Sequence, residues 1–148
     1  MDLTTRPSKS EYYLDIARAV SARATCLRRR FGAVIVKDDE IISTGYNGAP
    51  RGCANCCDLG ICKREQLNIP PGERYELCRS VHAEANAIIA ADFTKMRGAV
   101  LYLYCVADTG GYYCEPCGMC KRLLINSGIA LVVTPEKDYV VADWQNSI

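Results

Sequence analysis

The sequence predicts an α/β fold, a layered α/β/α domain in which helices flank a mixed central sheet on both faces. Two observations support this prediction. Segments with the apolar spacing of helices alternate with short β-branched runs, and a layered α/β domain buries the apolar faces of both kinds of element. The 148 residues are 49% hydrophobic, which suffices for one compact core. We therefore expect residues 1–148 to form a single domain.

The first elements expected along the chain are a helix and a hairpin. Residues 11–24 carry apolar side chains at helical spacing, which predicts an amphipathic helix. Residues 31–36 and 41–46 are short runs rich in β-branched side chains, and Asp38 and Asp39 lie between them. Two such runs joined by a short polar turn predict a β-hairpin.

Two further helices are expected in the second half of the chain. Residues 81–91 are rich in Ala and lack Pro and Gly, so they predict a buried helix with Ser80 as its N-cap. The other helix is expected to have Pro116 at its first position and to end at Gly128. Both helices would then direct their N-termini, which carry partial positive charge, toward one place.

Two buried strands are expected around these helices. Residues 98–104 and 129–134 are short apolar runs bounded by Gly or Thr, which is typical of strands in the middle of a sheet. Residues 139–144 predict one more short element, a strand or a helix. The order of helices and strands therefore agrees with the layered fold.

The most informative motif combines His82-Ala83-Glu84 with Pro116-Cys117-Gly118-Met119-Cys120. A catalytic zinc has three protein ligands and keeps its fourth position for water. His82, Cys117 and Cys120 would supply those ligands, and Glu84 would be a carboxylate beside the metal that moves protons. The alternative is a histidine buried in the core and a redox or structural C-x-x-C pair. His82 is the only histidine in the chain.

Composition excludes several classes of function. The net charge is +1 and the pI is about 7.4, so no strong positive field favours nucleic acid as a partner. Residues 1–6 lack an apolar signal core, and no stretch approaches the roughly 20 apolar residues that span a membrane. We expect a cytoplasmic protein. There its ten cysteines would favour metal over disulfides, with Cys105 and Cys114 as strand or loop thiols.

The chain resembles the deoxycytidylate (dCMP) deaminases of the cytidine deaminase-like superfamily. The resemblance extends from about residue 12 to residue 133 and rests on residues 32–36, 42–50, 82–88 and 116–120. The elements H-x-E and P-C-x-x-C are the signature of zinc nucleobase deaminases in general. The Gly-Tyr-Asn-Gly segment at residues 45–48 and the cysteine-rich insert narrow the resemblance to the deoxycytidylate branch.

The resemblance implies a reaction and a set of roles. The reaction is the hydrolytic deamination of dCMP to dUMP and ammonia in pyrimidine deoxynucleotide metabolism, with Zn²⁺ as the catalytic cofactor. Glu84 would be the proton shuttle. The backbone N–H of Ala83 and the carbonyl of Glu115 would flank the pyrimidine, and Asn47 would contact the sugar.

The resemblance also implies regulation. In this family the Gly-Tyr-Asn-Gly segment borders a regulatory nucleotide site where dCTP activates and dTTP inhibits, usually in hexamers, and Mg²⁺ can accompany the nucleotide. The corresponding residues here are Gly45, Tyr46, Asn47 and Gly48. A plain turn is the alternative interpretation, because Asn-Gly after a strand is a common turn signal that needs no ligand.

A cysteine-rich insert occupies residues 51–79 and has little apolar periodicity. A closed tetrahedral zinc would order such a segment. Phage enzymes of the family carry a second, structural zinc, and Cys26 and Cys56 match two of its ligand positions. The remaining phage ligands include histidines, which this chain lacks. We expect Cys62 and Cys78 instead, with Cys53 and Cys57 as alternates. The competing interpretation is a set of ordinary free cysteines.

Substrate recognition is expected near the first strand. Four arginines precede or begin that strand and could bind a 5′-phosphate, although a basic run is also typical of a solvated face: Arg23, Arg28, Arg29 and Arg30. Tyr112 and Tyr113 could cover the base, or they could be ordinary loop tyrosines.

Several alternatives to dCMP deamination remain open from the sequence. The substrate could be another cytosine nucleotide or nucleoside, such as dCTP or cytidine. A polynucleotide or tRNA deaminase would need a basic groove with aromatic platforms. A zinc-ordered interaction module without activity would leave Glu84 without a purpose.

Overall fold

The protein is described by a computed structural model that covers residues 1–110 and 114–147. Its centre is a sheet with the strand order β2-β1-β3-β4-β5. The strands are β1 (Arg29–Lys37), β2 (Glu40–Tyr46), β3 (Val100–Ala107), β4 (Leu131–Val133) and β5 (Asp138–Val140). Strands β3 and β4 are parallel, and the other neighbours are antiparallel. The mixed sheet predicted from the sequence is therefore confirmed.

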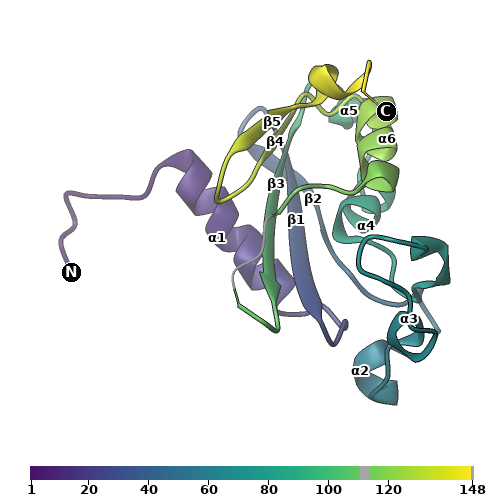
Figure 1. Ribbon diagram of the computed structural model, residues 1–148. Helices are drawn as coiled ribbons and strands as arrows, with labels where there is room; N and C mark the ends of the chain where they lie inside the picture. Colours follow the sequence, from purple (N-terminus) through teal and green to yellow (C-terminus); the bar gives the residue numbers. More distant parts are fainter. Residues whose placement is uncertain (111–113, 148) are drawn as a thin grey trace.

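Helices cover both faces of the sheet, as Figure 1 shows. Helix α1 (Lys9–Ser21) lies on one face, where Tyr13 and Ala17 pack with Val34 of β1. On the other face lie α4 (Ala83–Ala90), α5 (Phe93–Met96) and α6 (Gly118–Ser127). There Ile35 packs in a core with Leu124 of α6. Because successive residues of a strand point to opposite faces, Val34 and Ile35 serve the two cores in turn.

The predicted hairpin is confirmed, and its turn explains the pair of aspartates. Asp38 and Asp39 both have positive φ, 50° and 63°, the backbone of a tight two-residue hairpin turn. Helix α1 begins two residues before the predicted start at residue 11 and ends three residues before the predicted end at residue 24. Ser8 caps it by accepting a hydrogen bond from the Glu11 N–H, while the Glu11 carboxylate accepts one from the Ser8 N–H.

The second half of the chain forms the parallel crossover β3-α6-β4. Helix α6 ends at Gly128, whose φ of 80° places it in the left-handed region, as predicted. The segment at 139–144 contains both of the elements that the sequence left open. It continues β5 and then forms the short 3-10 helix η2 (Val141–Trp144).

The starts of two helices differ from the prediction. Helix α4 begins at Ala83 with His82 as its N-cap, so Ser80 is not the cap. Helix α6 begins at Gly118 with Cys117 as its N-cap, so Pro116 lies before the helix rather than at its first position. Both corrections move a predicted metal ligand to the residue that precedes a helix.

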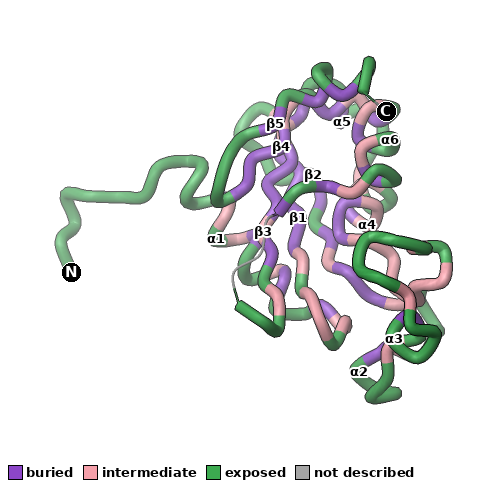
Figure 2. The backbone as a smooth tube through the Cα atoms, viewed as in Figure 1, coloured by how far each residue is buried: buried purple, intermediate pink, exposed green. Residues whose placement is uncertain are grey.

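The insert lies beside the main body of the domain. It contains α2 (Cys56–Leu59), α3 (Lys63–Gln66) and the 3-10 helix η1 (Tyr75–Leu77). Figure 2 shows this region as largely exposed, and Cys56 and Arg64 are its buried residues. None of the helices in the described ranges has the length and apolar character needed to cross a membrane.

One pair of cysteines departs from the sequence-based prediction. Cys105 and Cys114, expected as thiols, form a disulfide with a Cα–Cα distance of 5.7 Å. Cys105 lies on β3, and the chain returns from β3 to α6 through Cys114. Both residues are buried in the core shared by β3 and α6. This return of the chain, which the sequence does not reveal, brings the two sulfurs together.

Candidate metal centre and substrate pocket

Three predicted zinc ligands meet where α4 and α6 begin. The Nδ1 atom of His82 lies 3.5 Å from the Sγ of Cys117 and 3.5 Å from the Sγ of Cys120. His82 and Cys117 are the N-caps of the two helices, and neither side chain makes a capping hydrogen bond. A ligand at an N-cap is therefore available to a metal. It also lies beside the unpaired N–H groups of the first helical turn.

The distances between these atoms agree with tetrahedral zinc. With Zn–S near 2.3 Å and Zn–N near 2.0–2.1 Å, tetrahedral geometry separates N and S by about 3.6 Å. Both measured N···S distances are 3.5 Å. Among the residues that the structure describes, His82, Cys117 and Cys120 are the one group of three or more His, Cys, Asp or Glu residues whose ligand atoms all lie within 4.8 Å of one another. Three residues of this chain therefore match a zinc site with an open fourth position.

The protonation of the cluster is strongly perturbed. A hydrogen bond from Cys120 lowers the pKa of the Cys117 thiol to about 4. The same contact, together with burial, raises the pKa of the Cys120 thiol. A thiolate is the form that binds metal, and the lowered pKa of Cys117 favours that form.

Glu84 lies beside the cluster as predicted. Its Oε2 is 3.6 Å from the Sγ of Cys120, and the residue is 3% exposed. Burial raises the pKa of the Glu84 carboxyl, since removing a charged form from water is costly. A carboxyl group whose pKa is raised holds a proton more readily than an exposed one, which suits a group that accepts and releases a proton during a reaction.

A pocket opens in front of this cluster. His82, Glu84 and Cys117 line it, together with Ala83 and Glu115. Those two residues are the ones that the family resemblance places next to the pyrimidine. The Glu115 carboxylate itself forms an ion pair with Lys121 at 2.9 Å. The side chain of Glu115 therefore binds Lys121. The role predicted beside the pyrimidine belongs to the backbone carbonyl of Glu115, not to this side chain.

Two of the four predicted arginines line the pocket. They are Arg28 and Arg29, near the start of β1. Arg28 forms an ion pair with Glu65 of the insert, with its Nε 3.0 Å from Oε1. Arg23 instead lies over the ring of Tyr46 at 5.9 Å. Arg30 is exposed and donates to the carbonyl of Ala22 at 3.2 Å.

Asn47 lines the pocket and also fixes the end of the hairpin. Its Oδ1 accepts a hydrogen bond from the Phe31 N–H at 2.8 Å, and its Nδ2 donates to the Arg29 carbonyl at 3.0 Å. With 6% exposure, the amide is a rigid part of the pocket wall. Its second Nδ2 proton is the group that a sugar could use.

The Gly-Tyr-Asn-Gly segment straddles the end of β2: Gly45 and Tyr46 are its last two residues, and Asn47 and Gly48 follow it. A Cβ on Gly45 would lie 2.5 Å from the Ala83 carbonyl oxygen of α4, so only glycine permits this approach. The Tyr46 carbonyl accepts a hydrogen bond from Asn86 at 2.8 Å, and Gly48 forms a β-bridge with Val81. The segment therefore holds the start of α4 in place.

The four cysteines predicted as structural ligands lie in one region, but no three of their sulfur atoms, all in described residues, lie within 4.8 Å of one another. Cys26, Cys62 and Cys78 line the pocket, and Cys56 is buried next to them. Burial raises the pKa of the Cys56 thiol, and so does the proximity of the other three. Cys53 and Cys57, the alternates, are exposed. Tyr112 and Tyr113 lie outside the described residues.

Sequence reasoning missed several residues of the pocket. Phe31, Arg64, Tyr75 and Ser80 all line it. Arg64 and Tyr75 belong to the insert, where no periodicity marks buried positions. The available signal was position alone, since Tyr75 lies three residues before Cys78 and Ser80 lies two residues before His82.

Comparisons with known proteins agree with this geometry. The family model for the cytidine and deoxycytidylate deaminase zinc-binding region matches residues 7–136. The chain is 40% identical to a deoxycytidylate deaminase of Mycobacterium phage D29, over 90% of this chain and 98% of the relative. It is 38% identical to a deoxycytidylate deaminase of Schizosaccharomyces pombe, over 86% of this chain and 37% of that protein.

A solved structure shares the fold. The dCMP deaminase of cyanophage S-TIM5, crystallised in complex with dCMP and dUMP, superposes with a TM-score of 0.62 and 25% sequence identity. The match covers 88% of this chain and 82% of that one. The family model, the phage relative and the three-ligand centre all lead to one assignment: the chain belongs to the zinc-dependent cytidine and deoxycytidylate deaminase family.

Proposed function

We propose that this protein catalyses the hydrolytic deamination of dCMP to dUMP and ammonia. The observation that carries the proposal is the buried carboxyl of Glu84 beside three zinc ligands that leave a fourth position open. The choice of dCMP is supported by the phage relative, which is a deoxycytidylate deaminase along 98% of its own length.

The residues of the chain account for the steps of this reaction. His82, Cys117 and Cys120 would hold the zinc, which supplies a water whose pKa is lowered to near 7. Glu84 would take one proton from the attacking water as its oxygen bonds to C4 of the cytosine ring, and would deliver that proton to N3. It would then move the proton of the new C4 hydroxyl to the amino group, so that the C4–N bond breaks, the C4 carbonyl forms and ammonia leaves. The raised pKa of Glu84 favours both directions of transfer.

The substrate would be oriented by the pocket walls. The Ala83 N–H belongs to the first residue of α4, where a backbone donor has no partner within the helix, and it would bind the pyrimidine opposite the Glu115 carbonyl. Arg28 and Arg29 would bind the phosphate, with charge-assisted hydrogen bonds. The second Nδ2 proton of Asn47 would bind the sugar.

A substrate series tests the proposal. Purified enzyme should deaminate dCMP, and the fall in cytosine absorbance follows the reaction. Losing two charge-assisted phosphate contacts should lower kcat/KM for deoxycytidine more than tenfold, at about 1.5–3 kcal/mol for each contact. Comparable values for dCMP and deoxycytidine would contradict a dCMP enzyme. Activity confined to cytidine, dCTP or a tRNA would instead identify the protein as a deaminase of that substrate.

We also propose regulation by dCTP and dTTP, in a homo-oligomer of the size usual in the family, a hexamer. The regulatory nucleotide, with Mg²⁺, would lie against Gly45, Tyr46, Asn47 and Gly48. The contacts of this segment with the start of α4 support a route from such a site to His82. Assays of dCMP turnover should show a rise with dCTP and a fall with dTTP, and light scattering should give the mass of six chains.

A structural zinc held by Cys26, Cys56, Cys62 and Cys78 completes the proposal. The proximity of Cys26, Cys62 and Cys78 to Cys56 supports it, since after burial these neighbours are what raises the pKa of the Cys56 thiol. Backbone N–H groups also lie 3.4 Å from the Sγ atoms of Cys26 and Cys78, donated in each case by the residue two positions later. Hydrogen bonds to sulfur stabilise the thiolate that a metal requires.

A further inference from the structure

The insert contributes an aromatic wall to the pocket. The ring of Tyr75 in η1 meets the ring of His82 edge to face, with centroids 5.4 Å apart and planes at 78°. Tyr75 also lines the pocket. Tyr75 and His82 therefore form adjacent parts of the pocket wall, beside the atoms that would hold the metal.

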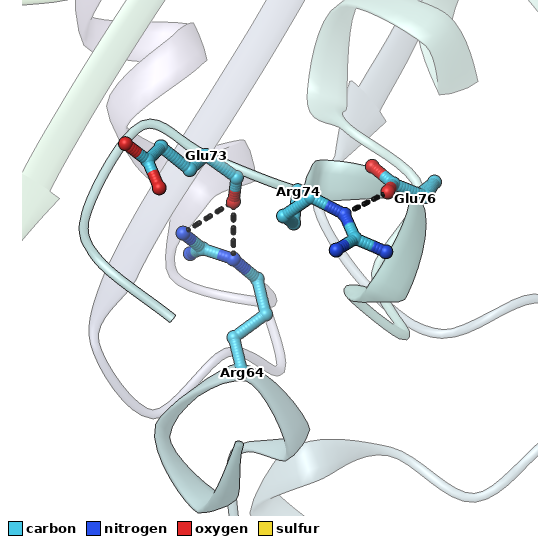
Figure 3. A network of polar contacts seen from close by, with 4 residues as sticks. All are labelled: Arg64, Glu73, Arg74 and Glu76. Atoms are coloured by element: carbon cyan, nitrogen blue, oxygen red, sulfur yellow. Dashed lines mark hydrogen bonds and ion pairs between the residues drawn. The ribbon is translucent and has the colours of Figure 1, made fainter. Parts of the chain in front are cut away.

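The position of Tyr75 is fixed by a buried arginine. Arg64 is 7% exposed, and its guanidinium lies over the Tyr75 ring at 4.7 Å from the centroid. Its Nε donates to the Glu73 carbonyl at 3.1 Å, and its Nη2 donates to the carbonyls of Glu73 and Pro70, both at 2.8 Å. Figure 3 shows the fork that Arg64 makes with the Glu73 carbonyl.

These contacts connect α3 to the turn that precedes η1. Arg64 belongs to α3, and the carbonyls that it binds lie in the turn leading to Tyr75. In the described ranges no carboxylate pairs with Arg64, so backbone carbonyls and the Tyr75 face are its recorded partners. A planar guanidinium can bind two carbonyls and stack on a ring at the same time, which an ammonium cannot do.

We propose that Tyr75 contacts the pyrimidine and deoxyribose of the bound nucleotide, and that Arg64 is a positioning residue that acts through Tyr75. The inference rests on the proposed function, because it names a determinant of substrate affinity in the same pocket. Tyr75 contributes to binding rather than to proton transfer, since Glu84 performs the latter. Its loss should therefore appear in KM much more than in kcat.

Substitution of Tyr75 tests the contact. Tyr75→Ala should raise KM for dCMP about tenfold, the effect expected for loss of one aromatic contact to a base, while kcat changes less than about threefold. Tyr75→Phe keeps the ring and should restore KM to within about twofold of wild type. An unchanged KM in Tyr75→Ala, or an equal fall of kcat, overturns the inference.

A double-mutant cycle tests the role of Arg64. Arg64→Lys should raise KM on its own, but Arg64→Lys combined with Tyr75→Ala should be no worse than Tyr75→Ala alone. Additive effects would mean that Arg64 acts independently of Tyr75. The matched control is Glu76→Gln, which removes the exposed ion pair of Arg74 and Glu76 next to Tyr75 (Figure 3) and should leave KM unchanged.

Affinity for the product dUMP distinguishes a failure of the proposed deaminase function from a failure of the proposed Tyr75 contact. The Kd of dUMP, measured by calorimetry on zinc-loaded enzyme, needs no turnover and should rise in Tyr75→Ala as KM does. An enzyme that leaves dCMP intact but binds dUMP in a Tyr75-dependent way would refute the proposed function and support this inference. An active enzyme whose affinity for dUMP is the same with and without the Tyr75 side chain would support the proposed function and refute this inference. A wild-type enzyme that does not bind dUMP would refute both.

Discussion

At the scale of single residues, the centre is built from two N-cap positions. The sequence places His82 within the first turn of a helix, whereas the structure places it just before the first helical residue, and Cys117 occupies the same position in α6. Spacing in the sequence identifies the ligands but leaves a helix boundary uncertain by one or two residues. The difference matters chemically, because an N-cap side chain is directed past the end of its helix toward the metal.

The first prediction concerns Glu84. Glu84→Gln keeps the size of the side chain and removes its ability to carry a proton. We expect the fold and the zinc content to remain, while kcat for dCMP falls by about 10² to 10⁴-fold, as for loss of a general acid and base. Metal analysis and single-turnover kinetics measure the two outcomes.

The matched control for that experiment is an exposed glutamate far from the pocket. Glu136 lies between β4 and β5 and is exposed, so Glu136→Gln should keep wild-type kcat. Deamination by Glu84→Gln at a rate close to wild type would show that another group moves the proton.

At the scale of elements, much of the fold could be predicted because local patterns determine it. The hairpin follows from two β-branched runs around Asp38 and Asp39, and the end of α6 follows from Gly128. The pairing of β1 with β3 could not be predicted, because strands 71 positions apart at their first residues carry no local mark of their register. The disulfide could not be predicted either, because it depends on how the chain returns from β3 to α6.

The contact between β2 and α4 gives a second prediction. A Cβ on Gly45 would lie 2.4 Å from the Ala87 nitrogen and 2.5 Å from the Ala83 oxygen, and backbone atoms of a helix cannot move aside cheaply. Gly45→Ala should lower the free energy of unfolding by about 1–3 kcal/mol or more, as overpacking does, and should displace His82. Denaturant unfolding and zinc affinity measure the effects.

The comparison variant for Gly45 is Gly118→Ala. The contact of a Cβ at Gly118 is an ordinary one, 3.6 Å to Arg122 Nη1, and the backbone there is helical. This variant should unfold at the same denaturant concentration as wild type or slightly higher. Equal loss of stability in both variants would mean that close approach to α4 is not the cause.

The contact of α1 with the hairpin turn makes stability depend on alkaline pH. The Tyr13 hydroxyl donates to Asp39 Oδ1 at 2.7 Å, which raises the pKa of Tyr13 to about 12. An unfolded tyrosine has a pKa near 10, so this stabilisation is complete below pH 10 and is lost between about pH 10 and pH 12.

Tyr13→Phe provides the test of that dependence. The variant should be less stable than wild type at pH 8, and the difference should narrow as the pH rises above 10, because phenylalanine does not titrate. Urea unfolding of both proteins from pH 8 to pH 11 measures it. A difference that stays constant with pH would show that Tyr13 titrates alike in the folded and unfolded chains.

At the scale of the whole molecule, the domain consists of a body with two apolar cores and an insert that has few buried residues. The body could be predicted from the sequence because burial leaves a periodic pattern, as in β1, where Val34 and Ile35 face opposite cores. The insert leaves no such pattern. Its contribution to the pocket, through Arg64 and Tyr75, depends on polar contacts with backbone carbonyls that no periodicity records.

The last prediction concerns what orders the insert. Each native chain should bind two zinc ions, one at His82, Cys117 and Cys120 and one at the four cysteines of the proposed structural site. A closed zinc site supplies folding free energy that a segment with few buried side chains otherwise lacks. Cys56→Ser or Cys78→Ser should therefore lower the metal content from two ions to one, loosen the insert and reduce stability.

The catalytic ion should remain in these variants, because its ligands come from α4, α6 and the residues before them. Cys53→Ser and Cys57→Ser are the matched controls, since both residues are exposed, and both variants should keep two ions. Hydrogen exchange would then show faster opening of residues 56–78 in Cys56→Ser than in Cys53→Ser, because only the former loses the metal that closes the segment. One zinc per native chain, or rapid reaction of Cys26, Cys56, Cys62 and Cys78 with a thiol reagent in the folded protein, would refute the second site.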